Sequence, residues 1–420
     1  MIKPFLLSTI IIFAFTLVSC TRAETTATQP LPGMLQAQQI HEVALPGGGQ
    51  ILSQVGEGVL FLGSQLQRTP TRYVVFYDAV QKRQLWDATL PGSAIKAIHL
   101  PGGDFILVTI QEKGNAHLLR LDGETGAILW DVPYANPTLD ALWREDMKDM
   151  LVSDGVSLWQ VAPRDGRQMA LLATGLGQSL HPDSVVLARS VDDPQTLYLS
   201  NNSMLLALNL KGGQAMETWR FSSAKFIAQL LPVHFFSGEQ GVIALAHSNV
   251  YFVDAAGKLA WHIKNKDINY TAIALPNAQE TEWVVFGNFV KGIYVVDAHG
   301  QRAHQPLPGG NVRILGIPVP IPKNILLGGI RATSSAAGAF PGYLLATRSL
   351  DNVFVYQLSP TGKLSLIAES PVNPGGEEMG TLIQQAQSNP NYPPFFLDDY
   401  LAVSQANGIT QFTLTLEGGS

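Results

Sequence analysis

Few side chains in this 420-residue chain have a type and spacing that could form a catalytic or metal site. The nine histidines are scattered without an HxH or HExxH spacing, so no common zinc site is predicted. The chain has no GxSxG nucleophile elbow and no GxxxxGK[ST] phosphate loop. The adjacent acid pairs Asp192-Asp193 and Asp398-Asp399 lie near prolines or loop residues, where turn formation is favoured. The residues therefore predict no catalytic, cofactor or metal site.

The single cysteine, Cys20, ends an apolar N-terminal segment. Residues 1–19 carry one early lysine and then a mainly apolar run, which is the pattern of a secretory signal peptide. The segment ends LVSC, which resembles the bacterial lipobox, and this resemblance implies cleavage before Cys20 and acylation of its thiol and new amino group. Several acyl chains together make a stable membrane anchor. The alternative is an ordinary signal peptide followed by a chance cysteine.

The segment after Cys20 is expected to be a flexible tether. Residues 20–37 are rich in Thr, Pro and Ala. Thr21 stands where lipoproteins of two-membrane bacteria commonly carry Asp when they stay in the inner membrane, so the resemblance implies an outer-membrane lipoprotein that faces the periplasm. No later apolar run reaches the 18 residues of a spanning helix. The expected membrane contact is therefore the lipid anchor.

A repeated hairpin pattern organises residues 38–420. Each copy has an apolar run, an Asp or Asn, a short polar turn and a second strand. The acid or amide starts the turn by bonding its own backbone, a glycine such as Gly126 supplies positive φ, and a tryptophan on the second strand needs burial and a partner for its N–H. The turn residues are Asp78, Asp122, Asn209, Asp254 and Asp297, and the tryptophans are Trp86, Trp130, Trp219 and Trp261.

The spacing of these hairpins predicts an all-β fold, a single β-propeller of eight four-stranded blades. With three weaker copies included, successive turns lie 40 to 61 residues apart, with a mean of about 48, which is room for four strands. Eight such units need about 383 residues, and residues 38–420 number 383. The chain ends without the last tryptophan strand, and residues 39–45 look like a lone final strand. We therefore expect the N- and C-terminal strands to pair and close the ring.

The unit Asp122-x-x-Thr125-Gly126-x-x-x-Trp130 resembles the repeat of pyrroloquinoline-quinone-type (PQQ-type) propellers. The resemblance covers most of residues 39–420 and is specific for a fold rather than an activity. One branch of these propellers is the quinoprotein dehydrogenases. Another is the BamB-type family of non-enzymatic propeller lipoproteins, which belong to the outer-membrane β-barrel assembly machinery and are also eight-bladed.

Comparison with the enzyme branch favours a non-enzymatic protein without a cofactor. Quinoprotein alcohol dehydrogenases commonly stack their cofactor on a vicinal disulfide, and some carry a CxxCH haem motif, whereas Cys20 is the only cysteine here. A nucleic-acid partner is not expected either, because the net charge is −6 and no basic run occurs. A quinone-dependent dehydrogenase-type propeller and a carbohydrate- or ligand-binding propeller remain as alternatives.

Two long insertions are the candidate partner-binding segments. Residues 313–342 contain an apolar, proline-rich strip, and residues 371–399 contain the run YPPFF. Long insertions in a compact repeat are often functional, although simple packing over the propeller is the alternative. The predicted anchors are Ile317, Val319, Ile321, Tyr392, Phe395 and Phe396. The expected function is a lipid-anchored periplasmic scaffold for protein partners in the cell envelope, with outer-membrane protein assembly as the role that the resemblance implies.

Overall fold

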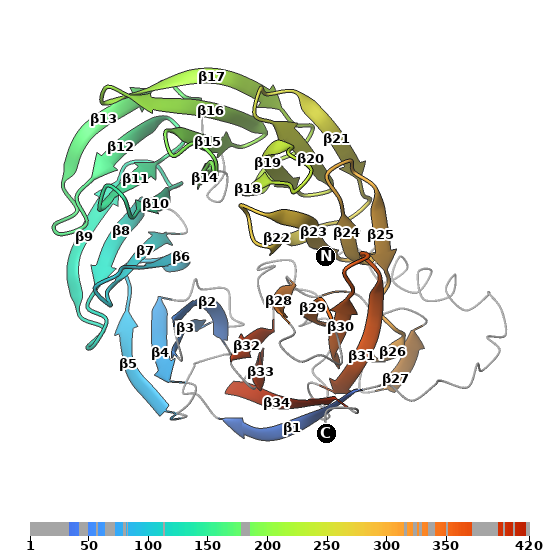
Figure 1. The fold of residues 1–420 in the computed structure, drawn as a ribbon. Coiled ribbons are helices and arrows are strands. Elements are labelled where there is room, and N and C mark those ends of the chain that lie inside the picture. The colour runs from blue at the N-terminus through green and yellow to red at the C-terminus, as the bar shows by residue number, and fades with distance from the viewer. Residues whose placement is uncertain are drawn as a thin grey trace, which may run out of the picture.

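The computed structural model of the chain shows an all-β ring in Figure 1. It describes residues 33–41, 49–55, 58–63, 72–78, 81, 83–111, 114–177, 185–314, 317–321, 326, 330–334, 341–349, 352–371, 394–397, 400–405 and 408–416. Cys20, Tyr392 and the expected signal peptide lie outside these residues. Every regular element within these ranges is a β-strand. A search of the same residues finds no candidate membrane-spanning helix.

Eight four-stranded antiparallel sheets form the blades of a propeller, as predicted. In each blade the first strand lies near the centre and the fourth at the rim (Figure 1). Blades 1 to 4 are β2 (Gly49–Val55), β3 (Gly58–Gly63), β4 (Tyr73–Asp78) and β5 (Arg83–Thr89); β6 (Ser93–His99), β7 (Phe105–Ile110), β8 (Ala116–Leu121) and β9 (Ile128–Tyr134); β10 (Asp140–Arg144), β11 (Asp149–Ser153), β12 (Ser157–Val161) and β13 (Gln168–Thr174); β14 (Val185–Arg189), β15 (Thr196–Asn201), β16 (Met204–Lys211) and β17 (Gln214–Ser222).

The second half of the ring repeats the arrangement and ends with a blade built from both ends of the described chain. Blades 5 to 8 are β18 (Ile227–His234), β19 (Gln240–Ala246), β20 (Asn249–Asp254) and β21 (Leu259–Lys264); β22 (Asn269–Pro276), β23 (Thr281–Asn288), β24 (Gly292–Val296) and β25 (Arg302–Gln305); β28 (Arg331–Ser334), β29 (Tyr343–Arg348), β30 (Asn352–Leu358) and β31 (Leu364–Pro371); β32 (Phe395–Leu397), β33 (Tyr400–Gln405), β34 (Gly408–Leu416) and β1 (Gly33–His41).

The hydrophobic core lies between neighbouring blades, because the middle strands are apolar on both faces. Five of the six residues of β7 are buried, whereas the rim strand β9 is mostly exposed. Phe252 of blade 5 and Phe286 of blade 6 belong to one buried cluster. Blade-to-blade packing of this kind makes the ring one structural unit.

The predicted closure is confirmed, with a corrected boundary. β1 pairs antiparallel with β34, and Gln36 lies opposite Thr413. The strand begins at Gly33, so residues 33–37 belong to the last blade and not to the expected tether of residues 20–37. Of the expected strand 39–45, residues 39–41 lie in β1, and residues 42–45 are outside the described ranges. The ends of the ring are thus joined by backbone hydrogen bonds, which removes an open sheet edge.

The four repeat tryptophans connect each blade to the next. Trp86 of blade 1 donates its indole N–H to the Gly123 carbonyl of blade 2 at 2.8 Å. Trp130, Trp219 and Trp261 make the same bond to the following blade, at 3.0–3.1 Å. In all four blades a β-bulge falls between the tryptophan and the preceding turn. A bulge re-aims side chains, and here it accompanies a tryptophan that reaches the neighbouring blade.

The predicted turn residues behave as expected at four of the five positions. The carboxylates of Asp78, Asp122, Asp254 and Asp297 each accept backbone N–H bonds within their own turn. Asn209 is the exception, because it lies inside β16 opposite Met216. Gly212 and Gly213, both with positive φ, make that turn without help from a side-chain acceptor.

Candidate functional site

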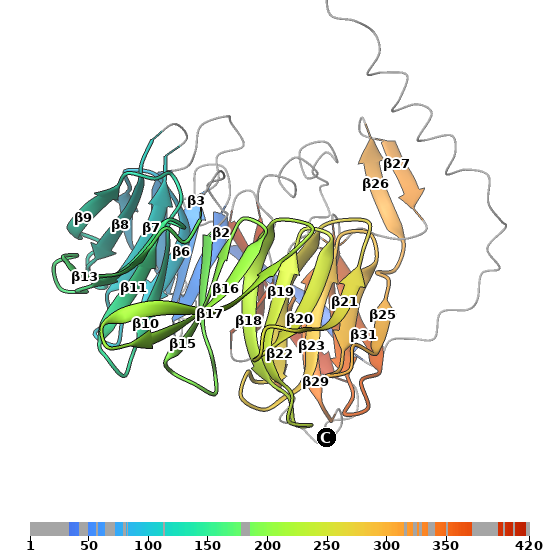
Figure 2. The same ribbon diagram turned by 90° about the horizontal axis from the view of Figure 1, so that it is seen from above.

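The strand ends that flank both long insertions lie on one face of the propeller. The connections from a rim strand to the next inner strand all leave the ring on the same side, because the strands of each blade alternate in direction. The segments between β25 and β28 and between β31 and β32 are both connections of this kind. We call this side the insertion face. In Figure 2 a two-stranded hairpin projects from it beyond the blades.

The hairpin consists of β26 (Gly310–Ile314) and β27 (Ile317–Ile321) and belongs to no blade. Directly opposed residues of an antiparallel pair share one face of the ribbon. The pairs on one face are Ile314 with Ile317, Val312 with Val319, and Gly310 with Ile321; those on the other are Arg313 with Pro318, and Asn311 with Pro320. By register, the positions of one face therefore hold only apolar residues and Gly310, and the predicted anchors Ile317, Val319 and Ile321 occupy positions on this face.

The prolines of the hairpin restrict how it can interact. Pro318 and Pro320 have no backbone N–H, so the outer edge of β27 lacks donors at these positions. A strand that lacks these donors is a poor template for another strand.

Phe395 and Phe396, from the second predicted anchor group, lie in a strand and not in a loop. Both residues lie in β32, the inner strand of blade 8, where Phe395 pairs with Ala402 and Phe396 with Leu401. Phe396 is half-buried and packs against the core cluster that contains Leu401. These positions therefore build the propeller instead of an exposed docking loop.

The insertions are also shorter than predicted. Residues 331–334 form β28, and Pro371 and residues 395–397 belong to strands of blades 7 and 8. Leu326 and Ile330 are fully buried in the core between blades 6 and 7. The first insertion thus leaves the ring after β25, forms the hairpin and returns to the core before β28.

The aspartates of the repeat accept hydrogen bonds within their turns. At Asp122 the hydroxyl and backbone N–H of Thr125 donate to the carboxylate at 2.8 Å. These bonds lower the pKa of Asp122, as expected for a carboxylate that is used as an acceptor. Within the described ranges, no group of three or more His, Cys, Asp and Glu side chains is arranged to hold a metal ion.

The ring, its tryptophan contacts and its terminal closure define an eight-bladed β-propeller with PQQ-type repeats. The family model described as "Outer membrane protein assembly factor BamB" matches residues 26–272. The match covers more than half of the chain, and the chain belongs to this family.

Several solved structures resemble the chain at low sequence identity, and two of them, with TM-scores above 0.5, share its fold. BamB from Moraxella catarrhalis is 13% identical, with a TM-score of 0.47 over 90% of this chain and 100% of that chain. The C-terminal WD40 domain of Sif2 is 11% identical, with a TM-score of 0.56 over 91% and 98%. The computationally designed Ika8 protein is 11% identical, with a TM-score of 0.54 over 90% and 100%. No curated protein sequence is a detectable match.

Sequence reasoning missed one blade contact that the structure reveals. Trp283 lies on β23, the second strand of its blade, and its ring lies against Gly362 of blade 7. The tryptophans of the repeat occupy the fourth strand instead. The sequence signal for this contact is Gly362, which lies four residues after Leu358. Gly126 lies four residues after Asp122 in the equivalent turn of blade 2.

Proposed function

We propose that this protein is a non-enzymatic, lipid-anchored scaffold of the cell envelope. In this proposal acylated Cys20 holds it at the outer membrane, and the propeller faces the periplasm. It docks a protein partner involved in envelope or outer-membrane protein assembly. The apolar face of the β26–β27 hairpin is the observation that carries the proposal.

Membership in the BamB family supports a propeller that works through protein contacts. The hairpin adds a surface for such contacts, since its apolar residues lie on an element outside the blades. Contiguous apolar surface rimmed by polar residues is typical of protein-interaction sites. Arg313 and Asn311 supply the polar side of this hairpin.

Affinity purification from detergent-solubilised membranes tests the docking surface. The variant Ile317→Ser/Val319→Ser removes apolar contact, and the matched control Asn311→Ser/Arg313→Ser changes the opposite face. We expect the first variant to lose the co-purified partner and the control to retain it, with both proteins melting like the wild type because the hairpin lies outside the blades. Retention of the partner by both variants would contradict the proposal.

The anchor has a separate test. Cys20→Ser should abolish labelling by a fatty-acid probe and release the protein from membranes, because the acylated thiol is removed. Equal labelling or equal membrane retention of the variant would remove the lipoprotein part of the proposal. The docking part would still stand on its own test.

A further inference from the structure

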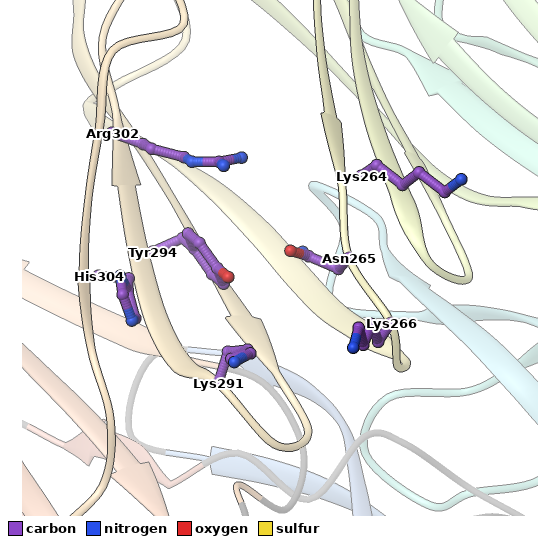
Figure 3. Close-up of a pocket in the computed structure, with 7 residues that line it drawn as sticks. All are labelled: Lys264, Asn265, Lys266, Lys291, Tyr294, Arg302 and His304. Carbon is purple, nitrogen blue, oxygen red and sulfur yellow. The ribbon is translucent and has the colours of Figure 1, made fainter.

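A pocket that the scaffold function does not use lies between blades 5 and 6. It has a volume of about 290 Å³, close to the lower limit for small-molecule sites of roughly 300 Å³. Its lining residues come from the segment at the end of β21, the β23–β24 turn, β24 and β25, as Figure 3 shows. They are Lys264, Asn265, Lys266, Lys291, Tyr294, Arg302 and His304.

The pocket concentrates positive charge in a protein whose net charge is −6. Three lysines and one arginine line it, and none of the seven lining residues is acidic. Within the described residues, cations elsewhere, such as Lys96 and Arg120, form ion pairs with carboxylates. Among the same residues, the four cations of the pocket form none. Like charges gathered in a concave site repel one another and attract an anion.

A buried amide network holds the segments that carry these cations. Asn269 donates its Nδ2 to the Ala246 carbonyl at 3.2 Å, which fixes its Oδ1 as an acceptor. That oxygen accepts one hydrogen bond from Nδ2 of Asn265 at 2.7 Å and another from Nδ2 of Asn288 at 2.9 Å. Asn288 in turn accepts the backbone N–H of Lys291 at 3.0 Å. The backbones at Asn265 and Lys291 are therefore held relative to each other before any ligand arrives.

The same network leaves a hydrogen-bond acceptor in the pocket. Asn265 is 8% exposed, and its Nδ2 is occupied by Asn269. Its amide oxygen is directed toward the side of the pocket lined by Tyr294 (Figure 3). A ligand that carries a hydroxyl beside its anionic group would satisfy both this acceptor and the surrounding cations.

Tyr294 supplies a hydroxyl donor to the pocket. Its ring stacks on Phe286 at 5.0 Å and on His304 at 5.5 Å, so its position is fixed from both sides. Burial raises the pKa of the Tyr294 phenol, and Arg302 partly opposes this effect. The phenol is consequently protonated at neutral pH and able to donate.

We propose that this pocket binds a phosphate group with an adjacent hydroxyl, the chemistry of glycerol phosphate. Lysine is an established phosphate ligand that acts as a point charge, and arginine binds phosphate through two parallel N–H bonds; the pocket offers three lysines and one arginine. Such a group can be free in solution or can be part of a lipid headgroup. The pocket does not depend on the hairpin or on Cys20.

Binding measurements on the full chain carrying Cys20→Ser test the proposal without interference from the anchor. The probes are inorganic phosphate and glycerol 3-phosphate by calorimetry, and flotation with vesicles of phosphatidylglycerol or of phosphatidylcholine. The variant Lys264→Gln/Lys291→Gln should weaken binding by roughly tenfold or more, since it removes two charge-assisted contacts. The matched control is Lys211→Gln/Lys258→Gln, which removes equal charge from the β16–β17 and β20–β21 turns, at the opposite end of the strands from the pocket. This control should bind like the parent chain.

Each outcome decides the proposal. Saturable binding of glycerol 3-phosphate supports a free ligand, and binding to phosphatidylglycerol vesicles alone supports a lipid headgroup, provided that only the pocket variant loses it. Equal loss in both double variants would show nonspecific charge attraction and overturn the proposal. Binding to phosphatidylcholine vesicles that equals binding to phosphatidylglycerol vesicles would also overturn the proposal. Binding of a polyglutamate peptide, with no binding of inorganic phosphate or glycerol 3-phosphate, would overturn it as well.

Discussion

At the scale of single residues, the contact between a tryptophan and the glycine of the next blade explains why both recur in the repeat. Gly126 has φ of +72°, and a Cβ placed on it would lie 2.5 Å from the Trp86 ring. Gly257 and Gly300 are crowded by Trp219 and Trp261 in the same way. Glycine is therefore required both by backbone conformation and by the approach of the indole.

A matched pair of substitutions separates these two requirements. Gly212 also has positive φ, +64°, but nothing lies within 4 Å of its added Cβ. Gly212→Ala should cost about 1–2 kcal/mol of unfolding free energy for the backbone alone. Gly126→Ala should cost about 1–3 kcal/mol more, because the methyl overpacks the indole. Urea unfolding of both variants measures the difference, and equal losses would show that the contact is unimportant.

The exposed pair between Asp146 and Arg189 gives a prediction for pH. Two guanidinium bonds of 2.6 and 2.7 Å hold the pKa of Asp146 at about 2, below the unfolded value of about 3.9. A lowered native pKa stabilises the fold above the unfolded value, and this stabilisation is lost as the pH falls toward 2. The carboxylate is half exposed, so the contribution is below about 1 kcal/mol.

The variant Asp146→Asn tests this assignment. Its unfolding free energy should lie slightly below that of the wild type from pH 7 down to about 4, and the two should converge as the pH falls toward 2. Urea midpoints measured at several pH values provide the comparison. A difference that grows on acidification would contradict the pairing.

At the scale of elements, the register of β1 against β34 determines how the ring closes. Gln36 lies opposite Thr413, and Met34 lies opposite Thr415. In a Cys20→Ser background, the pair Gln36→Cys/Thr413→Cys should oxidise within one chain, whereas the off-register pair Gln36→Cys/Thr415→Cys should not, because disulfides require close Cβ atoms. Non-reducing gels distinguish the two. Efficient oxidation of the second pair alone would contradict this register.

The blades could be predicted from sequence because their signals are local. The turn aspartates, the glycines and the tryptophans recur with a period set by four strands, and both the ring and its closure follow from that period. Asn209 misled the prediction because a two-glycine turn needs no side-chain acceptor. The start of β1 at Gly33 was missed because Thr, Pro and Ala in the preceding residues resemble a tether.

The candidate sites depend on contacts that sequence spacing does not encode. Phe395 and Phe396 follow two prolines and look like a loop, yet β32 needs apolar residues for the inner strand of blade 8. Ile317, Val319 and Ile321 were found by composition, but their common face depends on pairing with β26. The pocket between blades 5 and 6 joins residues of two blades, and no linear motif marks it.

At the scale of the whole molecule, the proposal of a non-enzymatic propeller predicts no response to a quinone cofactor. A ligand present at 100 times its dissociation constant would stabilise the fold by about 2.7 kcal/mol. We expect added pyrroloquinoline quinone with calcium to leave the melting temperature unchanged. A clear cofactor-dependent rise, accompanied by dye reduction on alcohols or sugars, would favour the dehydrogenase alternative.

The central claim is that the propeller presents its partner with the apolar face of the β26–β27 hairpin. A photo-crosslinking amino acid placed at Val319 in living cells tests it most directly, with Arg313 on the opposite face of the same hairpin as the matched position. We expect a discrete crosslinked protein adduct from Val319 and little or none from Arg313. No adduct at Val319, or equal adducts from both positions, would contradict it.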